Sequence, residues 1–299
     1  MFSKILVPLD GSNAAEKVLC YVRTIAGALK LPIELLEVID ISAMSAHLVG
    51  DKARYLDRFI TEAESASRRY LAEIGSNLAG FNVSSSVLRG KPAEVILEKA
   101  TAEPATLVAM ATHGRSGLNR WLLGSVAEKV LRGTGNPLFL VRADDDQQAT
   151  DAALHSIIVP LDGSTLAESV LPMVVQVAKI FDAALLLFRA FELPASAYYG
   201  RENYLPDYEE LANQVRADAQ RYLDGQVAAL NALGLSQVGS LLREGVGAEE
   251  IIRCAHERPR SLIAMCTHGR SGVKRRVLGS VTEKVVRHSG DPVLVLSAR

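Results

Sequence analysis

Three short motifs combine residue types that could hold a nucleotide or another phosphate-bearing ligand. Pro8–Ser12 (Pro-Leu-Asp-Gly-Ser) supplies an aspartate, whose carboxylate can accept hydrogen bonds from ribose hydroxyls or adenine. Thr112–Arg115 (Thr-His-Gly-Arg) supplies a glycine turn, where the missing Cβ lets backbone N–H groups approach an anion. Gly124–Glu128 (Gly-Ser-Val-Ala-Glu) opens an expected helix, whose N-terminal N–H groups and dipole favour phosphate. Together they indicate a local anion site beside a hydrogen-bonding carboxylate.

The same motifs occur a second time in the chain. Val7–Ser12 is repeated in full at Val159–Ser164. Thr112–Arg132 matches Thr267–Arg287 at 15 of 21 positions without a gap. A repeat of this length indicates two copies of one domain, and the middle of each copy varies while its ends hold.

The chain length agrees with two domains. At roughly 150 residues per domain, 299 residues accommodate two, each large enough for its own core. We expect the domains at residues 1–143 and 155–299, because the segment between them, residues 144–154, contains a polar, acidic and aperiodic run typical of a linker.

The apolar pattern of each copy alternates between short continuous runs and longer amphipathic stretches. Continuous runs are typical of strands buried on both faces. The expected strands are Ile5–Leu9, Ile33–Ile39, Val83–Leu88, Leu107–Ala111 and Leu138–Val141, and then Ile157–Leu161, Ala184–Ala190, Val238–Leu242, Leu262–Cys266 and Val293–Leu296. The expected helices of the first copy are Ala14–Leu29, Tyr55–Leu78, Ala93–Thr101 and Val126–Arg132, with matching segments in the second.

This alternation predicts an α/β protein of two tandem doubly wound five-stranded parallel sheets with helices on both faces. Ligands on such sheets bind beyond the carboxyl ends of the strands, at the switch point between neighbouring first and fourth strands. The aspartate motif follows the first strand and the glycine turn follows the fourth. We therefore expect the motifs of each copy to meet at one site.

Composition limits the partners and the location. The 33 basic and 34 acidic residues leave a formal charge of −1, which argues against nucleic acid as a partner. The longest apolar stretches are far shorter than the roughly 20 residues of a membrane helix, so no membrane partner is expected. Three cysteines without CxxC spacing support neither disulfides nor a zinc cluster, and we expect a cytoplasmic protein without a bound metal cluster.

Each motif also has a purely structural interpretation. Ser125–Glu128 and Ser280–Glu283 fit the S-x-x-E capping box, in which the serine would only satisfy helix N–H groups. Asp10 before Gly-Ser could be a turn and N-cap ahead of the first helix. His113 and His268 have no ligand partners at suitable spacing, so a role in fixing the loop is favoured over metal binding. The joint recurrence of the motifs favours the binding interpretation.

At these residues the chain resembles the universal stress protein family over nearly all of both halves. ATP-binding members carry the pattern G-x-x-G, nine residues, then G-[ST], with an aspartate after the first strand. Gly114 and Gly124-Ser125 match it, as do Gly269 and Gly279-Ser280. The first glycine of the pattern is replaced by Ala111 and Cys266, which add a Cβ where the pattern has none. Because cysteine is the bulkier of the two, we expect weaker binding in the second half.

The resemblance implies an adenine nucleotide alpha hydrolase-like, Rossmann-like fold and a pocket for ATP, or ADP or AMP, with Mg²⁺. It also implies that Val38 and Ala190 line the adenine pocket through their backbones and that Met110 and Met265 flank it. The candidate binding residues of the first half are Pro8, Leu9, Asp10, Val38, Met110, Ala111, His113, Gly114, Arg115, Gly124, Ser125 and Val126. Those of the second half are Pro160, Leu161, Asp162, Ala190, Met265, Cys266, His268, Gly269, Arg270, Gly279, Ser280 and Val281.

The leading hypothesis is a nucleotide-binding stress-response or regulatory protein, with at most slow incidental ATP hydrolysis. The chain contains no GxxxxGK[ST] loop, no GxGxxG fingerprint after its first strands and no G-x-S-x-G elbow, so no catalytic residue is assigned. Two alternatives stay open: an interaction module of the same fold that binds no nucleotide, and an uncharacterised ATP-using enzyme. Family members usually dimerise. A tandem chain can meet that need as an intramolecular pseudo-dimer through its two final strands, and a further homodimer is also open.

Overall fold

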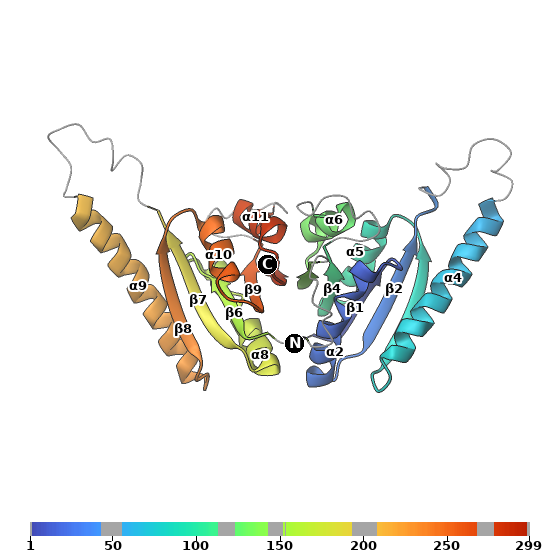
Figure 1. Ribbon diagram of the computed structural model, residues 1–299, viewed down its shortest axis with the longest axis horizontal. Coiled ribbons are helices and arrows are strands. Elements are labelled where there is room, and N and C mark those ends of the chain that lie inside the picture. Colours follow the sequence, from blue (N-terminus) through green and yellow to red (C-terminus); the bar gives the residue numbers. More distant parts are fainter. Residues whose placement is uncertain are drawn as a thin grey trace.

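The computed structural model describes residues 2–42, 56–112, 123–142, 152, 154–192, 208–267 and 278–297. These residues form a ten-stranded sheet with the strand order β3-β2-β1-β4-β5-β10-β9-β6-β7-β8, covered by helices on both faces (Figure 1). The strands within each half pair in parallel. The predicted α/β class, two tandem doubly wound parallel sheets with helices on both faces, is confirmed.

The first half contributes the strands β1 (Lys4–Leu9), β2 (Ile33–Ile39), β3 (Val83–Arg89), β4 (Thr106–Ala111) and β5 (Leu138–Val141). Its helices are α1 (Asn13–Glu16), α2 (Leu19–Leu29), α4 (Leu56–Asn77), α5 (Pro92–Ala102) and α6 (Ser125–Gly133). The chain runs from β1 outward to β3 and then returns to the other side of β1 at β4. The switch point therefore lies between β1 and β4, as expected.

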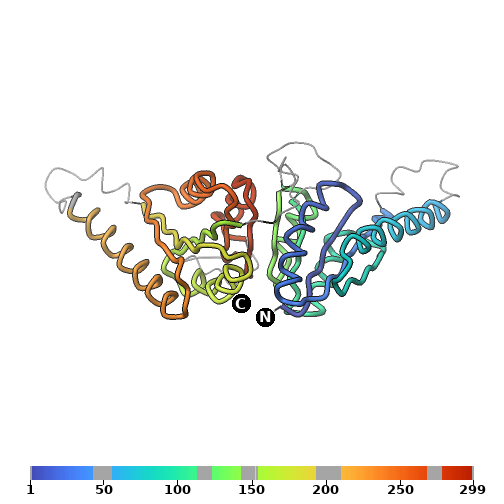
Figure 2. Tube along the Cα trace, turned by 60° about the horizontal axis from the view of Figure 1, so that its bottom comes forward, coloured from blue at the N-terminus to red at the C-terminus, as the bar shows by residue number. Residues whose placement is uncertain are grey.

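The second half repeats this order. Its strands are β6 (Ser156–Pro160), β7 (Ala184–Phe191), β8 (Val238–Glu244), β9 (Ser261–Cys266) and β10 (Val293–Leu296). Its helices are α7 (Thr165–Glu168), α8 (Leu171–Phe181), α9 (Tyr208–Ala232), α10 (Gly247–His256) and α11 (Ser280–His288). Figure 2 shows the two halves as blue-to-green and yellow-to-red blocks that meet along a central seam.

One predicted helix is wrong. Ala14–Leu29 is not continuous, because α1 ends at Glu16 and α2 begins at Leu19. The Lys17 N–H donates to the carbonyl of Ala14, which tightens the last turn instead of continuing the helix. The second half breaks at the same place, where a proline stands in the first turn of α8. The first half has no such proline, so its sequence does not mark the break.

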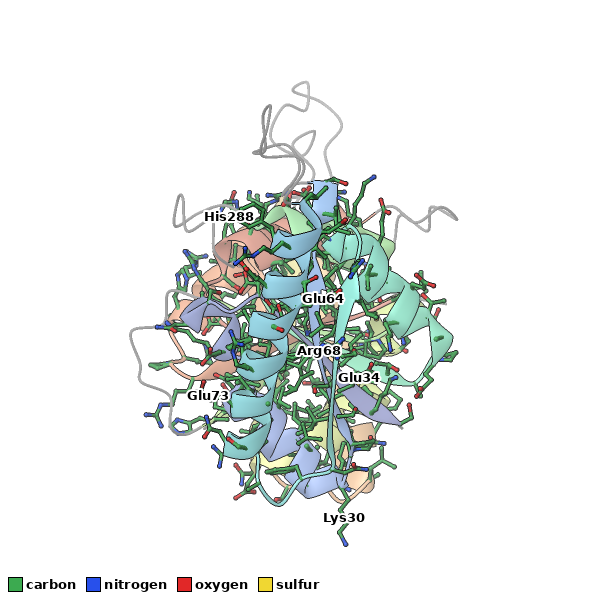
Figure 3. All side chains as sticks on the ribbon, turned by 90° about the vertical axis from the view of Figure 1, so that its right-hand side faces the viewer. Lys30, Glu34, Glu64, Arg68, Glu73 and His288 are labelled. Atoms are coloured by element: carbon green, nitrogen blue, oxygen red, sulfur yellow. The ribbon has the colours of Figure 1, made fainter. Side chains whose placement is uncertain are left out.

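Two apolar layers, one on each face of the sheet, hold the helices in place. Alternate strand residues point to opposite faces, so Ile5 and Val7 pack with α2 and α4, whereas Leu6 packs with α5 and α6. Each layer runs through both halves. The long helix α4 covers the outer end of the sheet, and charged residues such as Glu64 and Arg68 lie along it (Figure 3). No helix within the described ranges is long and apolar enough to cross a bilayer.

The halves join through their last strands. β5 and β10 pair in antiparallel fashion, with Phe139 opposite Leu294, and this turns two sheets into one. α2 contacts α8 beneath this junction. Above it, α6 and α11 exchange ion pairs: Arg132 Nη2 lies 2.7 Å from Glu283 Oε1, and Arg287 Nη2 lies 3.0 Å from Glu128 Oε1. The strand pairing leaves β3 and β8 as the edges of the ten-stranded sheet.

Candidate functional site

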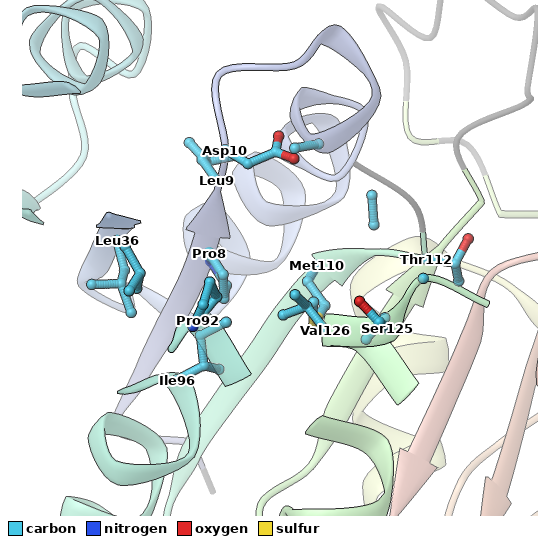
Figure 4. A pocket seen from close by; sticks show the side chains of 15 residues that line it. Pro8, Leu9, Asp10, Leu36, Pro92, Ile96, Met110, Thr112, Ser125 and Val126 are labelled. Atoms are coloured by element: carbon cyan, nitrogen blue, oxygen red, sulfur yellow. The ribbon is translucent and has the colours of Figure 1, made fainter. Parts of the chain in front are cut away.

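A cavity of about 280 Å³ lies at the carboxyl ends of β1 and β4 in the first half. Its wall is mainly apolar, and its polar groups come from the carboxylate of Asp10, the hydroxyls of Thr112 and Ser125, and backbone at the start of α6. In Figure 4, Asp10 lies beyond the end of β1, and Met110, Ser125 and Val126 lie across from it. The sequence motifs on β1 and before α6 therefore meet at one cavity.

Asp10 is held by the turn that follows it. Its Oδ1 accepts hydrogen bonds from the Ser12 N–H at 3.1 Å and from the Ser12 hydroxyl at 2.6 Å. The Ser12 oxygen in turn accepts from the Ala15 N–H at 3.2 Å, which makes Ser12 the N-cap of α1. The predicted turn is thus present, but the cap is Ser12 and not Asp10. Asp10 lines the cavity with its carboxylate already oriented by Ser12.

The first turn of α6 is open at the cavity. Gly124 is the N-cap, and no side chain provides a cap hydrogen bond. The Gly124 N–H donates to the carbonyl of Thr112 at 2.8 Å, which ties the helix start to the end of β4. The N–H groups of this turn and the positive end of the helix dipole therefore suit an anion.

The capping-box interpretation is wrong in both halves. A capping box needs the serine at the N-cap, but Ser125 and Ser280 are the first helical residues, one position later. The glutamate of the motif is engaged elsewhere. Glu128 accepts from Arg132 at 3.2 Å, and its Oε1 lies 3.0 Å from Arg287. Glycine at the N-cap leaves the helix start accessible because it carries no side chain.

The second half forms an equivalent cavity of about 300 Å³ at the ends of β6 and β9. Asp162 Oδ1 accepts from the Ser164 N–H at 2.9 Å and from its hydroxyl at 2.6 Å, as Asp10 does from Ser12. Gly279 caps α11 without a side-chain hydrogen bond. The two cavities thus have similar volumes, and weaker binding in the second half stays a prediction.

Cys266 is the main chemical difference in the wall of the second cavity. Its side chain is 5% exposed, and its Sγ lies 3.1 Å from the Ser169 hydroxyl. Burial raises the pKa of the Cys266 thiol. The Thr282 hydroxyl donates to the Cys266 carbonyl at 2.9 Å, a bond that Ala127 cannot make at the equivalent place in the first half. The thiol is thus neutral and packed beside Ser169, in the apolar layer on the face opposite Met265.

The structure brings most of the predicted residues to the two cavities. Those that line the first are Pro8, Leu9, Asp10, Val38, Met110, Ala111, Gly124, Ser125 and Val126. Those that line the second are Pro160, Leu161, Asp162, Ala190, Met265, Cys266, Gly279, Ser280 and Val281. The predicted residues His113, Gly114, Arg115, His268, Gly269 and Arg270 lie outside the described residues. Whether any of these residues binds a ligand stays a prediction.

Sequence reasoning missed one wall of each cavity. Pro92 and Ile96 of α5 and Leu36 of β2 line the first, and Phe188 and Ile251 take corresponding places in the second. Leu36 could have been found from strand periodicity, since it lies two residues before Val38 and points to the same face. The α5 residues follow no motif. Ala15, Thr112, Ala127, Ala167, Gly247 and Thr282 complete the additional lining.

The described part of the cavity wall offers groups that can bind a ligand. The wall in the described part offers one carboxylate, hydroxyls and helix N–H groups around apolar surface. The described residues contain no group of three or more His, Cys, Asp or Glu side chains placed to hold a metal ion. A flat apolar group with a polar, anionic extension matches this distribution of surfaces.

Comparisons with known proteins agree with this architecture. The family model described as the Universal stress protein family matches residues 1–142 and 154–297. The chain is 27% identical over 142 residues to universal stress protein MJ0531 of Methanocaldococcus jannaschii, covering 48% of this chain and 83% of that protein. It is 22% identical to universal stress protein Rv2005c of Mycobacterium tuberculosis, covering 97% of this chain and 96% of that protein.

A solved structure supports the fold over the whole length. The crystal structure of a universal stress protein from Archaeoglobus fulgidus superposes with a TM-score of 0.70 at 22% identity and covers 99% of both chains. The two family matches fall on the two halves that share one ten-stranded sheet. The chain therefore belongs to the universal stress protein family and carries two of its domains in tandem.

Proposed function

We propose that the protein binds an adenine nucleotide, ATP or its products ADP and AMP, at both cavities and serves a stress-response or regulatory role. The observation that carries this proposal is the twofold occurrence of one arrangement. In each half an oriented aspartate and an uncapped helix N-terminus face each other across an apolar cavity.

The cavity wall has the surfaces that a nucleoside needs. Leu36, Ile96 and Met110 provide apolar contact for a planar base, and the volumes of about 280 and 300 Å³ stand at the lower end of ligand pockets. These volumes fit a base and part of a ribose. Asp10 and Asp162 would accept hydrogen bonds from ribose hydroxyls, because Ser12 and Ser164 hold the carboxylates at the ends of β1 and β6.

The helix starts would hold the phosphates. N–H groups at Ser125 and Ser280 carry the partial positive charge of a helix N-terminus and have no side-chain cap to compete with a ligand. Gly114 and Gly269, with their neighbouring His and Arg residues, remain part of the proposed phosphate site through the sequence pattern alone. Mg²⁺ would accompany ATP through its phosphate oxygens rather than through a protein cage.

We propose binding without dedicated catalysis. The chain contains no GxxxxGK[ST] loop, the usual apparatus of phosphoryl transfer. Any ATP hydrolysis would be slow and incidental. The second candidate function is an interaction module that binds no nucleotide, and it is favoured by Ala111 and Cys266, which occupy the strand ends where nucleotide-binding relatives carry glycine.

The β5–β10 pairing also supports a proposal about assembly. Single-domain relatives usually dimerise, and we propose that this chain forms the equivalent pair internally, with residues 1–143 and 155–299 as its domains and 144–154 as the linker. A homodimer of such chains stays a proposal for light scattering to decide. The free thiols of Cys254 and Cys266 suit a reducing compartment, so we propose the cytoplasm as its location.

Isothermal titration calorimetry tests nucleotide binding. The double variant Gly124→Val with Gly279→Val adds a branched side chain at both helix starts, and we expect it to weaken binding of ATP with Mg²⁺ at least tenfold. The glycine φ angles of −59° and −62° are accessible to any residue, so the backbone itself is not strained by valine.

The matched control is Gly135→Val. An added Cβ at Gly135 meets nothing within 4 Å, and Gly135 lies outside the cavity lining. We expect this variant to bind ATP as the unmodified chain does. Equal heats from the double variant and the unmodified chain would show that the helix starts are not the site. Absence of heat from the unmodified chain would favour the interaction module.

A further inference from the structure

One charged position behind the two cavities is inverted between the halves. Glu37 of β2 is equivalent to Arg189 of β7. Each lies at the same distance in the sequence after the aspartate motif of its own half. The register places Glu37 beside Leu9, next in the chain to Asp10. The pairing of Pro160 with Phe188 likewise places Arg189 beside Leu161, next to Asp162.

Both side chains point away from the cavity. Their strand neighbours, Leu36 with Val38 and Phe188 with Ala190, line the two cavities, so position 37 or 189 faces the opposite side of the sheet. On that side each half has the same tyrosine and glutamate. The Tyr70 hydroxyl donates to Glu16 at 3.0 Å in the first half. In the second, Tyr222 donates to Glu168 at 2.8 Å and Gln226 donates to the same oxygen at 3.1 Å.

The first half thus gathers carboxyl groups behind its cavity. Glu37 is 7% exposed, and Glu16 contacts Tyr70 on the same face. Burial, followed by the carboxylates of Glu16, Glu37 and Asp10, raises the pKa of the Tyr70 hydroxyl. Of these groups only Glu37 is buried, and a charge at a buried position is weakly screened and is felt by a ligand at the strand ends.

The second half places a cation at this position. The Arg189 guanidinium carbon stacks 4.8 Å from the centroid of the Tyr222 ring. Its Nη1 lies 3.3 Å from the place that a Cβ on Gly163 would occupy, so the guanidinium contacts the turn that carries Asp162. Burial raises the pKa of Tyr222, and Glu168 and Asp162 raise it further, whereas Arg189 opposes this effect. The second half thus carries a guanidinium at the position where the first half carries a carboxyl group.

We infer that the two cavities select nucleotides of different charge: the first takes the nucleotide as its Mg²⁺ complex, and the second takes the more anionic nucleotide without the metal. This inference rests on the proposed function. Bound Mg²⁺ cancels part of the negative charge of the phosphates. Glu37 therefore penalises the metal-free nucleotide, and Arg189 favours it. Neither residue touches the ligand, so each acts on ligand charge and not on the shape of the pocket.

Single-pocket proteins separate the two sites. Gly279→Val leaves the first cavity as the binding site, and Gly124→Val leaves the second. In each, calorimetry gives the dissociation constants for ATP with Mg²⁺, for ATP with EDTA, and for adenosine as an uncharged reference. We expect the first cavity to prefer the Mg²⁺ complex and the second to prefer metal-free ATP, with a difference of at least tenfold between the two preferences.

Charge-neutral variants then assign the preference to the residue. Glu37→Gln, introduced into the Gly279→Val protein, should strengthen the binding of metal-free ATP about fivefold relative to that of the Mg²⁺ complex. This value follows from one charge acting over roughly 10 Å at partial screening. Arg189→Gln, introduced into the Gly124→Val protein, should weaken the binding of metal-free ATP about fivefold. Adenosine affinity should stay unchanged in both. Glu37→Asp and Arg189→Lys keep the charge and should keep the preference, which separates charge from packing.

The two halves also differ in charge at a second position, where Lys17 of the first half corresponds to Ser169 of the second. A variant at Lys17 therefore serves as the control. Lys17→Ser should alter the preference less than Glu37→Gln does, since Lys17 is more exposed and better screened. A larger effect of Lys17→Ser would overturn the assignment to position 37. Equal metal preference in both cavities, with ATP bound, would overturn the inference but leave the proposed function standing. No binding of ATP or adenosine at either cavity would overturn both.

Discussion

Phe139 stands at the junction of the two halves and tests whether they unfold as one unit. It lies on β5 opposite Leu294 of β10, is 1% exposed, and its ring centroid is 5.4 Å from that of Tyr21. Phe139→Ala removes a fully buried ring from an apolar layer that runs through both halves. Truncations of this kind cost about 3–5 kcal/mol of unfolding free energy.

The shift in melting temperature depends on how much of the chain unfolds together. An unfolding entropy of about 2.1 cal/mol/K per residue amounts to about 0.6 kcal/mol/K when all 299 residues unfold at once. A loss of about 4 kcal/mol then lowers the melting temperature by about 6 °C. If one half of about 150 residues unfolded alone, the same loss would lower it by about 13 °C. The continuous sheet predicts the smaller shift.

Differential scanning calorimetry distinguishes these outcomes. We expect a single transition for the unmodified chain and for Phe139→Ala, with the variant about 6 °C lower. Phe59→Ala is the matched control, since Phe59 is 43% exposed on α4 and its removal should shift the transition by less than about 2 °C. Two separate transitions, of which one moves by about 13 °C while the other stays, would refute the reasoning that the shared strands couple the halves.

Two further outcomes follow from the thiols and from the half-buried carboxylate of Glu34. Iodoacetamide should label Cys266 slowly, and ATP should slow this labelling several-fold more, whereas Cys254, which is 0% exposed, should react only on unfolding. Mass spectrometry of the peptides measures the labelling of both cysteines. Labelling of Cys266 that does not change with ATP would place the nucleotide elsewhere. Burial raises the pKa of Glu34, but the ammonium groups of Lys4 and Lys99, at 2.8 and 2.9 Å, outweigh it and hold the pKa below its ordinary 4.5. Because the native pKa is the lower one, this stabilisation is present above pH 4.5 and is lost as the pH falls below it. Glu34→Gln should therefore cost about 2 kcal/mol at pH 7 and progressively less toward pH 3, and a cost independent of pH in urea titrations would contradict the assignment.

Much of the fold could be predicted from the sequence because both halves bury continuous apolar strands. Ile33–Ile39, Leu138–Val141 and Val293–Leu296 have the predicted bounds. The break between α1 and α2 could not be predicted from the first copy, since no proline or glycine marks it. The short α1 contacts β1 and β4, and such tertiary contacts are not visible in a local pattern.

The candidate site was predictable where residues belong to a motif and not where they only share a surface. Asp10 and Gly124 follow from turn and helix-start patterns, but Pro92 and Ile96 line the cavity because α5 crosses β2 and β4, which depends on the sheet order. The S-x-x-E pattern misled because it does not state which residue is the N-cap. The bond from Gly124 to Thr112 fixes the helix start one residue earlier, and that bond spans a stretch of chain that no local pattern describes.

The pairing of β5 with β10 also changes what a mutation can do to this protein. In a pair of identical chains joined at that edge, a substitution appears in both subunits at once, so both cavities must change together. Here the partners are encoded by different stretches of one gene and are always present in equal amounts. Each cavity can therefore accumulate substitutions while the other keeps its properties. The exchanges of alanine for cysteine at the strand end and of glutamate for arginine behind it are changes that a symmetric pair could not have made on one side only.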